Sequence, residues 1–239
     1  MTEKIIIKAE RLTKQFGHFT ATDHITFEVR EGEIFGFLGA NGAGKTTAMR
    51  MLCGLSQPSD GWATVAGYDV ATQHEQVKQN IGYMSQKFSL YDDLTVEENF
   101  TLFGGIYGMS RKEMKEKTTR LLEELDFASE RKTKVKSLPL GWKQKLAFSL
   151  AIFHEPKIVF LDEPTGGVDP VTRRQFWELI YQAADRNITV FVTTHYMDEA
   201  EYCDRVSIMV DGKIEALDSP ANLKQQFEGK KIIVHRAEL

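Results

Sequence analysis

The sequence predicts an α/β fold built on a largely parallel sheet. Three short runs rich in Ile, Val and Phe, at residues 33–38 (EIFGFL), 157–161 (KIVFL) and 188–193 (ITVFVT), are bounded by Gly, Pro or Asn and are typical of buried strands. Helical patterns follow the first two runs, at residues 45–55 and 170–185. Strands that alternate with helices in this way indicate an α/β protein.

The stretch at residues 87–154 has a different pattern and predicts a helical subdomain inserted into the α/β core. Its helix-like segments are VEENFTLFGGIYG, RKEMKEKTTRLLEELDF and GWKQKLAFSLAIF. The core would then comprise residues 1–86 and 155–239, within one domain of 239 residues. Near the end, VSIMVDGKIEAL has a DG turn between two alternating runs and predicts a hairpin. Ser219 and Pro220 predict the cap and the first position of a last helix.

Composition restricts the classes of partner. A net charge of -4 gives no general attraction to nucleic acid or to an anionic membrane. The basic run RKTKVK at residues 131–136 could suggest nucleic acid, but a solvated face is the better interpretation at this net charge. No apolar run approaches the roughly 18 residues that span a bilayer, and MTEKIIIKAE does not predict a signal peptide. We therefore expect any membrane role to come through another chain. Cys53 and Cys203, with no CxxC pairing, predict buried thiols in a reducing cytoplasm.

The strongest chemical signal is GANGAGKTT, which matches GxxxxGK[ST] between a predicted strand and a predicted helix. Glycines let successive backbone N–H groups surround a triphosphate, and the helix N-terminus adds partial positive charge. Lys45 is expected to bridge the β- and γ-phosphates, and Thr46 to hold Mg²⁺. A glycine-rich turn without a ligand is the alternative, which this context disfavours. The predicted nucleotide-binding residues of this phosphate loop are Gly39, Ala40, Asn41, Gly42, Ala43, Gly44, Lys45, Thr46 and Thr47.

Further polar residues stand at the ends of the other two predicted strands. Asp162 and Glu163, in IVFLDEP, are adjacent carboxylates that are costly to bury unless a cation or a reacting water uses them. Asp162 suits Mg²⁺ coordination and Glu163 suits activation of water as a general base. An acidic pair that caps the next segment is the structural alternative. His195 ends FVTTH; a lone His is more often structural, but this imidazole could bind a γ-phosphate oxygen and hold the attacking water in line.

Five motifs taken together resemble one family. GANGAGKTT, YMSQ, LPLGWKQKL, LDEPTGGVD and TTH, in this order over essentially the whole chain, resemble the ATP-binding subunits of ABC transporters. The resemblance implies a P-loop NTPase core, with a RecA-like mostly parallel sheet and an antiparallel β part, and an inserted α-helical subdomain. It implies ATP hydrolysis with ATP and Mg²⁺ as cofactors. It also implies that Gln86 contacts Mg²⁺ and the attacking water, and that Phe16 stacks on adenine. Asp169 would lie at a dimer interface, and His195 matches the family's switch histidine.

The segment LPLGWKQKL departs from the family's usual LSGGQ or LSGGM. Leu138 aligns with the first leucine, which puts Pro139 where serine is expected and Leu140 where the first glycine is expected; Gly141 remains, and Trp142 takes the fifth position. In the family this segment caps the γ-phosphate bound to the other subunit. LPLGW resembles a variant found in ABC-2-type exporter subunits, so we interpret it as functional, with a degenerate half-site as the alternative.

The backbone around the variant segment is expected to replace the lost serine. Proline is tolerated in the first turn of a helix, so the helix can still direct its positive end at phosphate. The N–H groups of Leu140 and Gly141 would contact the nucleotide, provided that Leu140 avoids a positive φ. Trp142 would add apolar packing.

The resemblance implies the ATP-hydrolysing subunit of an ABC-2-type exporter, with drug-like or lipid-like molecules as candidate substrates. It would act as a homodimer or with a paired ATP-binding subunit, docked on a separately encoded polytopic membrane permease at the cytoplasmic face of the inner membrane, without nucleic acid. The run KFSLYDDLTVEENF resembles the surface that receives a coupling helix of the permease. Taken singly, Phe88 or Tyr91 fits an ordinary core aromatic better.

A soluble, non-transport ABC ATPase of ribosome function, DNA repair or cofactor assembly is the alternative function. Translation factors of the family carry two ATP domains in one chain, and repair members insert a long coiled coil; the sequence has neither feature. A GTPase is disfavoured because the sequence has no NKxD motif.

Overall fold

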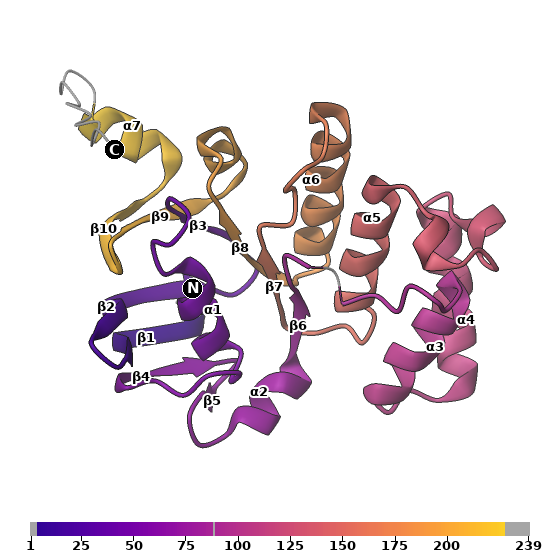
Figure 1. Ribbon diagram of the computed structural model, residues 1–239, viewed down its shortest axis with the longest axis horizontal. Coiled ribbons are helices and arrows are strands. Elements are labelled where there is room, and N and C mark those ends of the chain that lie inside the picture. The colour runs from indigo at the N-terminus through magenta and orange to yellow at the C-terminus, as the bar shows by residue number, and fades with distance from the viewer. Residues whose placement is uncertain (1–3, 88, 228–239) are drawn as a thin grey trace.

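The structure is a computed structural model that describes residues 4–87 and 89–227 (Figure 1). These residues form two β-sheets with helices around them. The strands of the larger sheet are β3 (Ile34–Leu38), β6 (Ile81–Met84), β7 (Ile158–Asp162), β8 (Thr189–Thr194), β9 (Arg205–Val210) and β10 (Lys213–Asp218). They lie in the order β10-β9-β3-β8-β7-β6, and neighbouring strands are parallel except for β9 and β10.

The three strands predicted from apolar runs are adjacent members of this sheet. β3, β8 and β7 lie side by side, and every residue in them is buried. Because these strands are parallel, their carboxyl ends meet at one edge of the sheet, which is where α/β proteins bind ligands. The predicted α/β fold is confirmed, and the loops that carry the sequence motifs leave the sheet together.

Two helices follow the predicted strands. α6 (Pro170–Asp185) has the predicted bounds, whereas α1 (Lys45–Leu52) ends before the predicted position 55. Gly54 has a φ of 66°, and its N–H and that of Leu55 both donate to carbonyls in the last turn of α1. This is a Schellman C-cap, which ends a helix where glycine supplies the left-handed conformation.

A four-stranded antiparallel sheet packs against the larger sheet, with α1 and a large cluster of buried apolar side chains between them. Residue patterns alone did not delineate this sheet, which was expected only from the family resemblance. Positive φ angles at Arg11 and His24, and register shifts between the first two strands, interrupt the alternation that marks a strand. In the order β2-β1-β4-β5, its strands are β1 (Ile5–Phe16), β2 (Phe19–Arg30), β4 (Asp60–Val65) and β5 (Tyr68–Asp69).

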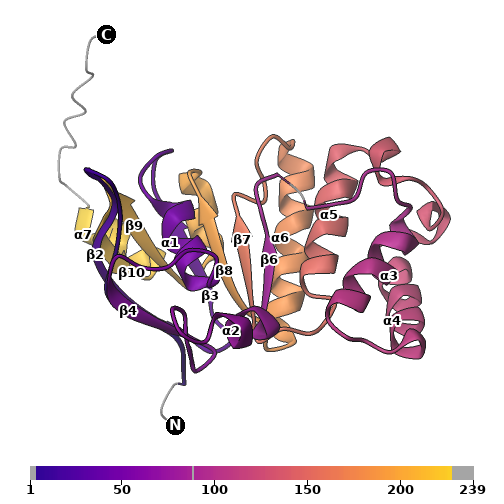
Figure 2. The ribbon, with the colours of Figure 1, turned by 60° about the horizontal axis from the view of Figure 1, so that its bottom comes forward.

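The middle of the chain folds as helices, as predicted. α3 (Val96–Ile106), α4 (Arg111–Glu124) and α5 (Leu140–Ala151) bury an apolar cluster of their own, which includes Phe100 and Leu122. Figures 1 and 2 show α3 and α4 at the end of the molecule remote from the antiparallel sheet, with α5 beside α6. Besides α7 at the end of the described chain, the remaining described helices are α2 (His74–Asn80) and the 3₁₀ turns η1 (Ala128–Glu130), η2 (Val135–Ser137) and η3 (Met197–Tyr202).

One expectation for this region is wrong. Tyr91, expected as an ordinary core aromatic, is 51% exposed, and its ring meets Phe103 edge-on with the centroids 6.3 Å apart. The backbone N–H and carbonyl of Tyr91 bond the buried side chain of Asn99. The fold therefore holds this residue by its backbone and leaves the ring at the surface. Phe88, named in the same expectation, lies outside the described residues.

The predictions for the end of the chain are confirmed. β9 and β10 form a hairpin whose turn residues, Asp211 and Gly212, have φ angles of 45° and 81°. Positive φ at both central residues is what a two-residue hairpin turn requires. α7 (Pro220–Phe227) begins at its proline, and the Ser219 hydroxyl accepts the Asn222 N–H at 3.3 Å.

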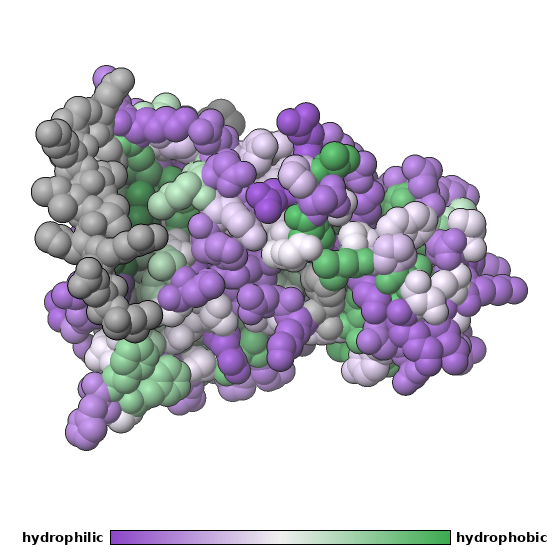
Figure 3. Space-filling view, turned by 45° about the horizontal axis from the view of Figure 1, so that its top comes forward, coloured by the Kyte–Doolittle hydropathy of each residue, from purple (hydrophilic) through white to green (hydrophobic). Residues whose placement is uncertain are grey.

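The interior and the surface agree with the composition. Cys53 and Cys203 are buried free thiols, as expected, and burial raises the pKa of both. On the face shown in Figure 3, hydrophobic side chains form separate patches between hydrophilic ones. Among the described residues, no helix is both long enough and apolar enough to cross a membrane.

Candidate active site

The phosphate loop connects β3 to α1 and depends on glycine geometry. Gly44, the N-cap residue of α1, has a φ of 102°, and a Cβ there would lie 2.1 Å from the carbonyl oxygen of Ala21. Gly42 has a φ of 84°. No other residue type fits at position 44 without a shift of the backbone. The loop therefore curls so that the first-turn N–H groups of α1, which lack intrahelical partners, are available to an anion.

Lys45 is held inside this loop. Its side chain is only 4% exposed, and its Nζ donates to the carbonyls of Gly39 at 2.8 Å and Ala40 at 3.0 Å. An ammonium group has three protons, and its third partner is the Glu163 carboxylate, with Nζ and Oε1 3.3 Å apart. The loop thus fixes Lys45, whose third contact is with the acidic residue that follows β7.

Asp162 ends β7 and lies beside the phosphate loop. Its Oδ1 accepts hydrogen bonds from the hydroxyl groups of Thr46 at 3.1 Å and Thr193 at 2.8 Å. Among the described residues, no group of three His, Cys, Asp or Glu side chains could hold a metal ion. One carboxylate with one hydroxyl instead fits Mg²⁺, which takes few protein ligands and completes its shell with water and substrate phosphates.

Glu163 is the residue on which the predicted catalytic side chains converge. Besides Lys45, its carboxylate contacts Gln86 Nε2 at 3.2 Å and His195 Nδ1 at 3.2 Å. Its φ is 48°, and its N–H is held by the carbonyl and the hydroxyl of Thr193 at 3.1 and 3.0 Å. A positive φ in a residue other than glycine is strained and persists only where surrounding contacts hold it, as Thr193 holds the Glu163 N–H.

Other predicted site residues lie apart from this group. Phe16, at the end of β1, is 55% exposed, and Lys14 Nζ lies 5.2 Å from its ring centroid. Asp169 caps α6, and a hydrogen bond from the Thr172 hydroxyl lowers its pKa. Within the described residues, no hydrogen bond or ion pair joins the variant segment, residues 138–142, to the carboxylate of Glu163. The nucleotide contacts of these residues stay predictions.

The variant segment begins α5, with one difference from expectation. Pro139 lies one position before the helix, with φ −58° and ψ 156°, instead of within its first turn. Its carbonyl accepts the N–H groups of Trp142 and Lys143, so proline acts as the residue that opens the helix. Leu140 is helical, avoids a positive φ and is 45% exposed. The N–H groups of Leu140 and Gly141 are therefore at the free end of the helix, as the prediction requires.

The rest of this segment packs within the same chain. The Trp142 ring stacks on Phe127, with centroids 4.5 Å apart and planes 18° apart, which ties the start of α5 to the helical region. A Cβ at Gly141 would lie 2.7 Å from Thr172 Cγ2. Glycine here thus lets α5 pack closely against Thr172 of α6.

Sequence reasoning missed several polar residues behind the site. Thr193 lies in the quoted FVTTH run and is fully buried, as is Gln144, whose Nε2 is 3.5 Å from the Gly166 carbonyl. Glu199 is fully buried in η3 and binds the Thr165 hydroxyl. A threonine among apolar strand residues was a usable signal, whereas nothing in MDEAEY separates Glu199 from its exposed neighbours.

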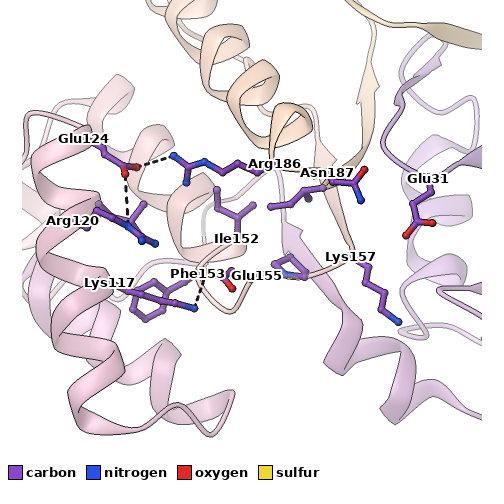
Figure 4. Close-up of a pocket in the computed structure, with 13 residues that line it drawn as sticks. Glu31, Lys117, Arg120, Glu124, Ile152, Phe153, Glu155, Lys157, Arg186 and Asn187 are labelled. Atoms are coloured by element: carbon purple, nitrogen blue, oxygen red, sulfur yellow. Dashed lines mark hydrogen bonds and ion pairs between the residues drawn. The ribbon is translucent and has the colours of Figure 1, made fainter.

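A cavity of about 500 Å³ lies elsewhere, at the edge where the parallel strands begin (Figure 4). Charged residues around it pair with one another, with Lys117 and Glu155 3.0 Å apart and Arg186 and Glu124 3.1 Å apart. None of the sequence-predicted site residues lines this cavity.

The phosphate loop, the lysine inside it and the acidic pair at the end of β7 define a P-loop NTPase. Residues 22–166 match the family model for the ABC transporter. The chain belongs to the ABC transporter family and is an ATPase domain of that family.

Similar proteins agree with this family. The chain is 50% identical over 221 residues to the "Probable multidrug ABC transporter ATP-binding protein YbhF" of Escherichia coli, covering 92% of this chain and 38% of the relative. It is 35% identical over 229 residues to the "Linearmycin resistance ATP-binding protein LnrL" of Bacillus subtilis, covering 95% of this chain and 74% of the relative. A solved "Structure of ATP binding subunit of ABC transporter" has a TM-score of 0.83 and 27% identity, and covers 93% of each chain. The chain therefore spans well under half the length of the E. coli relative, and most of the length of the B. subtilis relative and of the solved structure.

Proposed function

We propose that the chain is the ATP-hydrolysing subunit of an ABC-2-type exporter with drug-like or lipid-like substrates. The observation that supports hydrolysis most is the carboxylate of Glu163, which lies within 3.3 Å of Lys45, Gln86 and His195. These four residues come from four separate segments of the chain. Export is supported by the relatives whose names refer to multidrug transport and linearmycin resistance.

ATP lies along the phosphate loop in this proposal. One proton of Lys45 Nζ turns from Glu163 to a γ-phosphate oxygen and a second leaves a loop carbonyl for a β-phosphate oxygen, so that Lys45 bridges the two phosphates. N–H groups at the start of α1 bind the other phosphate oxygens. Phe16, exposed at the end of β1, presents its ring to adenine. The exchange at Lys45 releases the Glu163 carboxylate for a water molecule.

Thr46, Asp162 and Gln86 are proposed to hold Mg²⁺. The hydroxyl of Thr46 and Oδ1 of Asp162 are already 3.1 Å apart, so little movement is needed for both to face one ion. When bound, Mg²⁺ neutralises charge on the β- and γ-phosphates.

The remaining residues handle the attacking water. Glu163 accepts its proton as general base, which typically contributes about 10²- to 10⁴-fold to a rate. His195 is oriented by its Nδ1 contact with Glu163, which leaves Nε2 for a γ-phosphate oxygen. Gln86 orients the water and lies just before the helical region, so it also connects the nucleotide to that region.

The site is completed by partners. Residues 138–142 of a second subunit would cap the γ-phosphate, and a solved "Dimeric structure of a post-hydrolysis state of the ATP-binding cassette MJ0796 bound to ADP and Pi" supports such a dimer. A separately encoded permease would dock on the surface around residues 87–100, at the cytoplasmic face of the membrane. Tyr91 is exposed there, as a docking residue needs to be.

The test is purification of the tagged protein from detergent-treated membranes of its native host. We expect a polytopic membrane protein to co-purify, and the preparation to hydrolyse Mg-ATP. Glu163→Gln is the matched control, because it should retain the same partner while losing hydrolysis. Recovery with ribosomes or DNA and without a membrane protein would contradict the exporter and favour the soluble alternative.

A further inference from the structure

An ion pair between Glu199 and Arg173 lies next to the segment that follows the two carboxylates at the end of β7. Glu199, in η3, is fully buried; its Oε1 accepts the Thr165 hydroxyl and lies 3.6 Å from Arg173 Nε. Glu199 Oε2 and Arg173 Nε have no hydrogen-bond partner among the described residues, so the contact is an ion pair without a hydrogen bond; another Arg173 nitrogen pairs with Asp198 at 3.4 Å. Because a buried carboxylate is costly without its partners, Glu199 fixes the two segments that carry Thr165 and Arg173.

Both partners belong to the segment that follows Glu163. Thr165 is 1% exposed and lies between Glu163 and α6. Arg173 lies in the first turn of α6, and its N–H donates to the carbonyl of Asp169 at 2.9 Å. Glu199 thus holds this segment near both of its ends.

The same pair reaches the loop that carries His195. The Arg173 guanidinium lies 4.2 Å from the ring centroid of Tyr196, a cation–π distance, and the Tyr196 and His195 rings are 4.1 Å apart. The Glu199 N–H donates to the Tyr196 carbonyl at 3.3 Å. The Glu163 and His195 loops leave different strands but share one buried support.

We propose that the Glu199–Arg173 pair is a positioning element that keeps Glu163 and His195 in register for ATP hydrolysis. The proposal rests on the roles given to Glu163 and His195 in the proposed function. The pair acts through those residues, and Lys45 is held by other contacts in the phosphate loop. Disturbing the pair should therefore slow the chemical step and leave ATP binding nearly unchanged.

The chain provides a control ion pair at the opposite edge of the six-stranded sheet, where the parallel strands begin. Glu33 is 8% exposed, and its carboxylate pairs with Arg205 at 2.8 Å, next to the start of β3. Glu33→Gln and Glu199→Gln each remove one buried charge from one Glu–Arg pair. Only the second pair touches the loops of the site.

The experiment measures steady-state Mg-ATP hydrolysis and thermal unfolding for the 239-residue chain and both variants. We expect Glu199→Gln to lower kcat by roughly 10- to 100-fold, as a small misplacement of reacting groups does. Its KM should change by less than about twofold, because phosphate binding is intact. Glu33→Gln should lower Tm and leave kcat unchanged at temperatures where the protein is folded.

A rescue separates positioning from general damage. Arg173→Met leaves Glu199 buried without its cation and should lower kcat more than Glu199→Gln does. Adding Glu199→Gln to Arg173→Met removes the uncompensated charge and should raise kcat above that of Arg173→Met alone. Failure of the double variant to recover any activity would contradict the pairing.

Two outcomes would overturn the proposal outright. One is a Glu199→Gln variant with the wild-type kcat and only a lower Tm, and the other is a raised KM at unchanged kcat. Glu163→Gln, measured alongside, separates this failure from that of the proposed function. If Glu163→Gln hydrolyses ATP like the wild type, the assigned base is wrong; if it is inactive while Glu199→Gln is fully active, only the positioning role is wrong.

Discussion

In the six-stranded sheet, the edge where the parallel strands begin and the edge where they end hold polar groups in different ways. Where the parallel strands begin, Glu33 pairs with Arg205 at 2.8 Å, and the Thr189 hydroxyl accepts the Gly32 N–H at 2.8 Å. Where the strands end, Glu163 is shared among three partners at 3.2 to 3.3 Å. Where the strands begin, these polar groups bond one another at short distances. Where the strands end, the Glu163 carboxylate makes longer contacts, and a bound ligand could replace these contacts.

A cavity is a poor guide to function in this molecule. The cavity in Figure 4 lies at the edge where strands begin, and its ion pairs, such as Lys117 with Glu155, neutralise charge between neighbouring elements. The candidate site lies at the other edge, where a carboxylate and an ammonium group are buried beside a glycine loop. The contacts of Glu163 with residues from three other motifs were a better indicator of the functional site than the cavity.

Replacement of Glu163 should have the largest effect. Glu163→Gln preserves the shape of the side chain and removes the base, so we expect kcat to fall by about 10²- to 10⁴-fold with ATP still bound. Phosphate release and equilibrium binding of a fluorescent ATP analogue measure the two quantities. Turnover at the wild-type rate would remove Glu163 from this role.

A matched pair of threonines in β8 compares the two edges directly. Thr193→Val removes contacts with Asp162 at 2.8 Å and with the Glu163 N–H at 3.0 Å, and Thr189→Val removes the contact with Gly32. Each should destabilise the fold by about 1–3 kcal/mol, because the buried Asp162 carboxylate or the part-buried Gly32 N–H loses its hydroxyl partner. Only Thr193→Val should also lower kcat, by at least about tenfold, since it releases the Asp162 carboxylate and weakens the hold on the Glu163 backbone.

Urea unfolding and ATP hydrolysis, measured on both threonine variants, check this prediction. Because the two residues lie on one strand and are both fully buried, a difference in kcat cannot arise from burial alone. An equal loss of kcat in the two variants would show that the edges do not differ in function.

The smallest expected effect is a pH dependence of stability from His154. Its Nε2 bonds the carbonyl of Ile81 at 3.0 Å, its ring stacks on Tyr107, and burial lowers its pKa to about 4. The unfolded chain binds a proton near pH 6.5 and the folded protein only near pH 4, so stability is full above pH 6.5 and falls as the pH drops between these values.

The size of this effect is limited because only one proton is involved. Between pH 7 and pH 6, His154 should remove less than about 1 kcal/mol. Urea unfolding of the wild type and of His154→Gln at both pH values isolates it, since the variant has no titrating ring at this position. An identical pH dependence in the two proteins would contradict the assignment.

The sequence predicted those parts of the fold that repeat a simple pattern. β3, β7 and β8 are buried on both faces and appear as continuous apolar runs, which is how parallel strands read. The antiparallel sheet was not readable, because positive φ angles at Arg11 and His24 break its alternation. Tyr91 was misjudged, since its environment depends on a backbone contact with Asn99.

The site residues likewise fall into those that the sequence predicts and those that only the fold brings together. Lys45, Asp162 and Glu163 lie in contiguous motifs at the ends of predicted strands, so their proximity was predictable from the sequence. Glu199 and Arg173 lie in different segments, and neither segment has a residue pattern that indicates burial. Their pairing is a product of tertiary packing, which only the folded chain brings about.

We propose that LPLGW, residues 138–142, still closes on ATP held by a second copy of the chain. Light scattering with size-exclusion chromatography of Glu163→Gln, with and without Mg-ATP, tests it most directly. We predict monomers without nucleotide and dimers with Mg-ATP, both in this protein and in one that also carries Pro139→Ser and Leu140→Gly. The lost serine hydroxyl is worth roughly 1.5–3 kcal/mol, which weakens the contact without abolishing it. Dimers that form only when the usual signature is restored would contradict the claim and identify the native segment as a degenerate site.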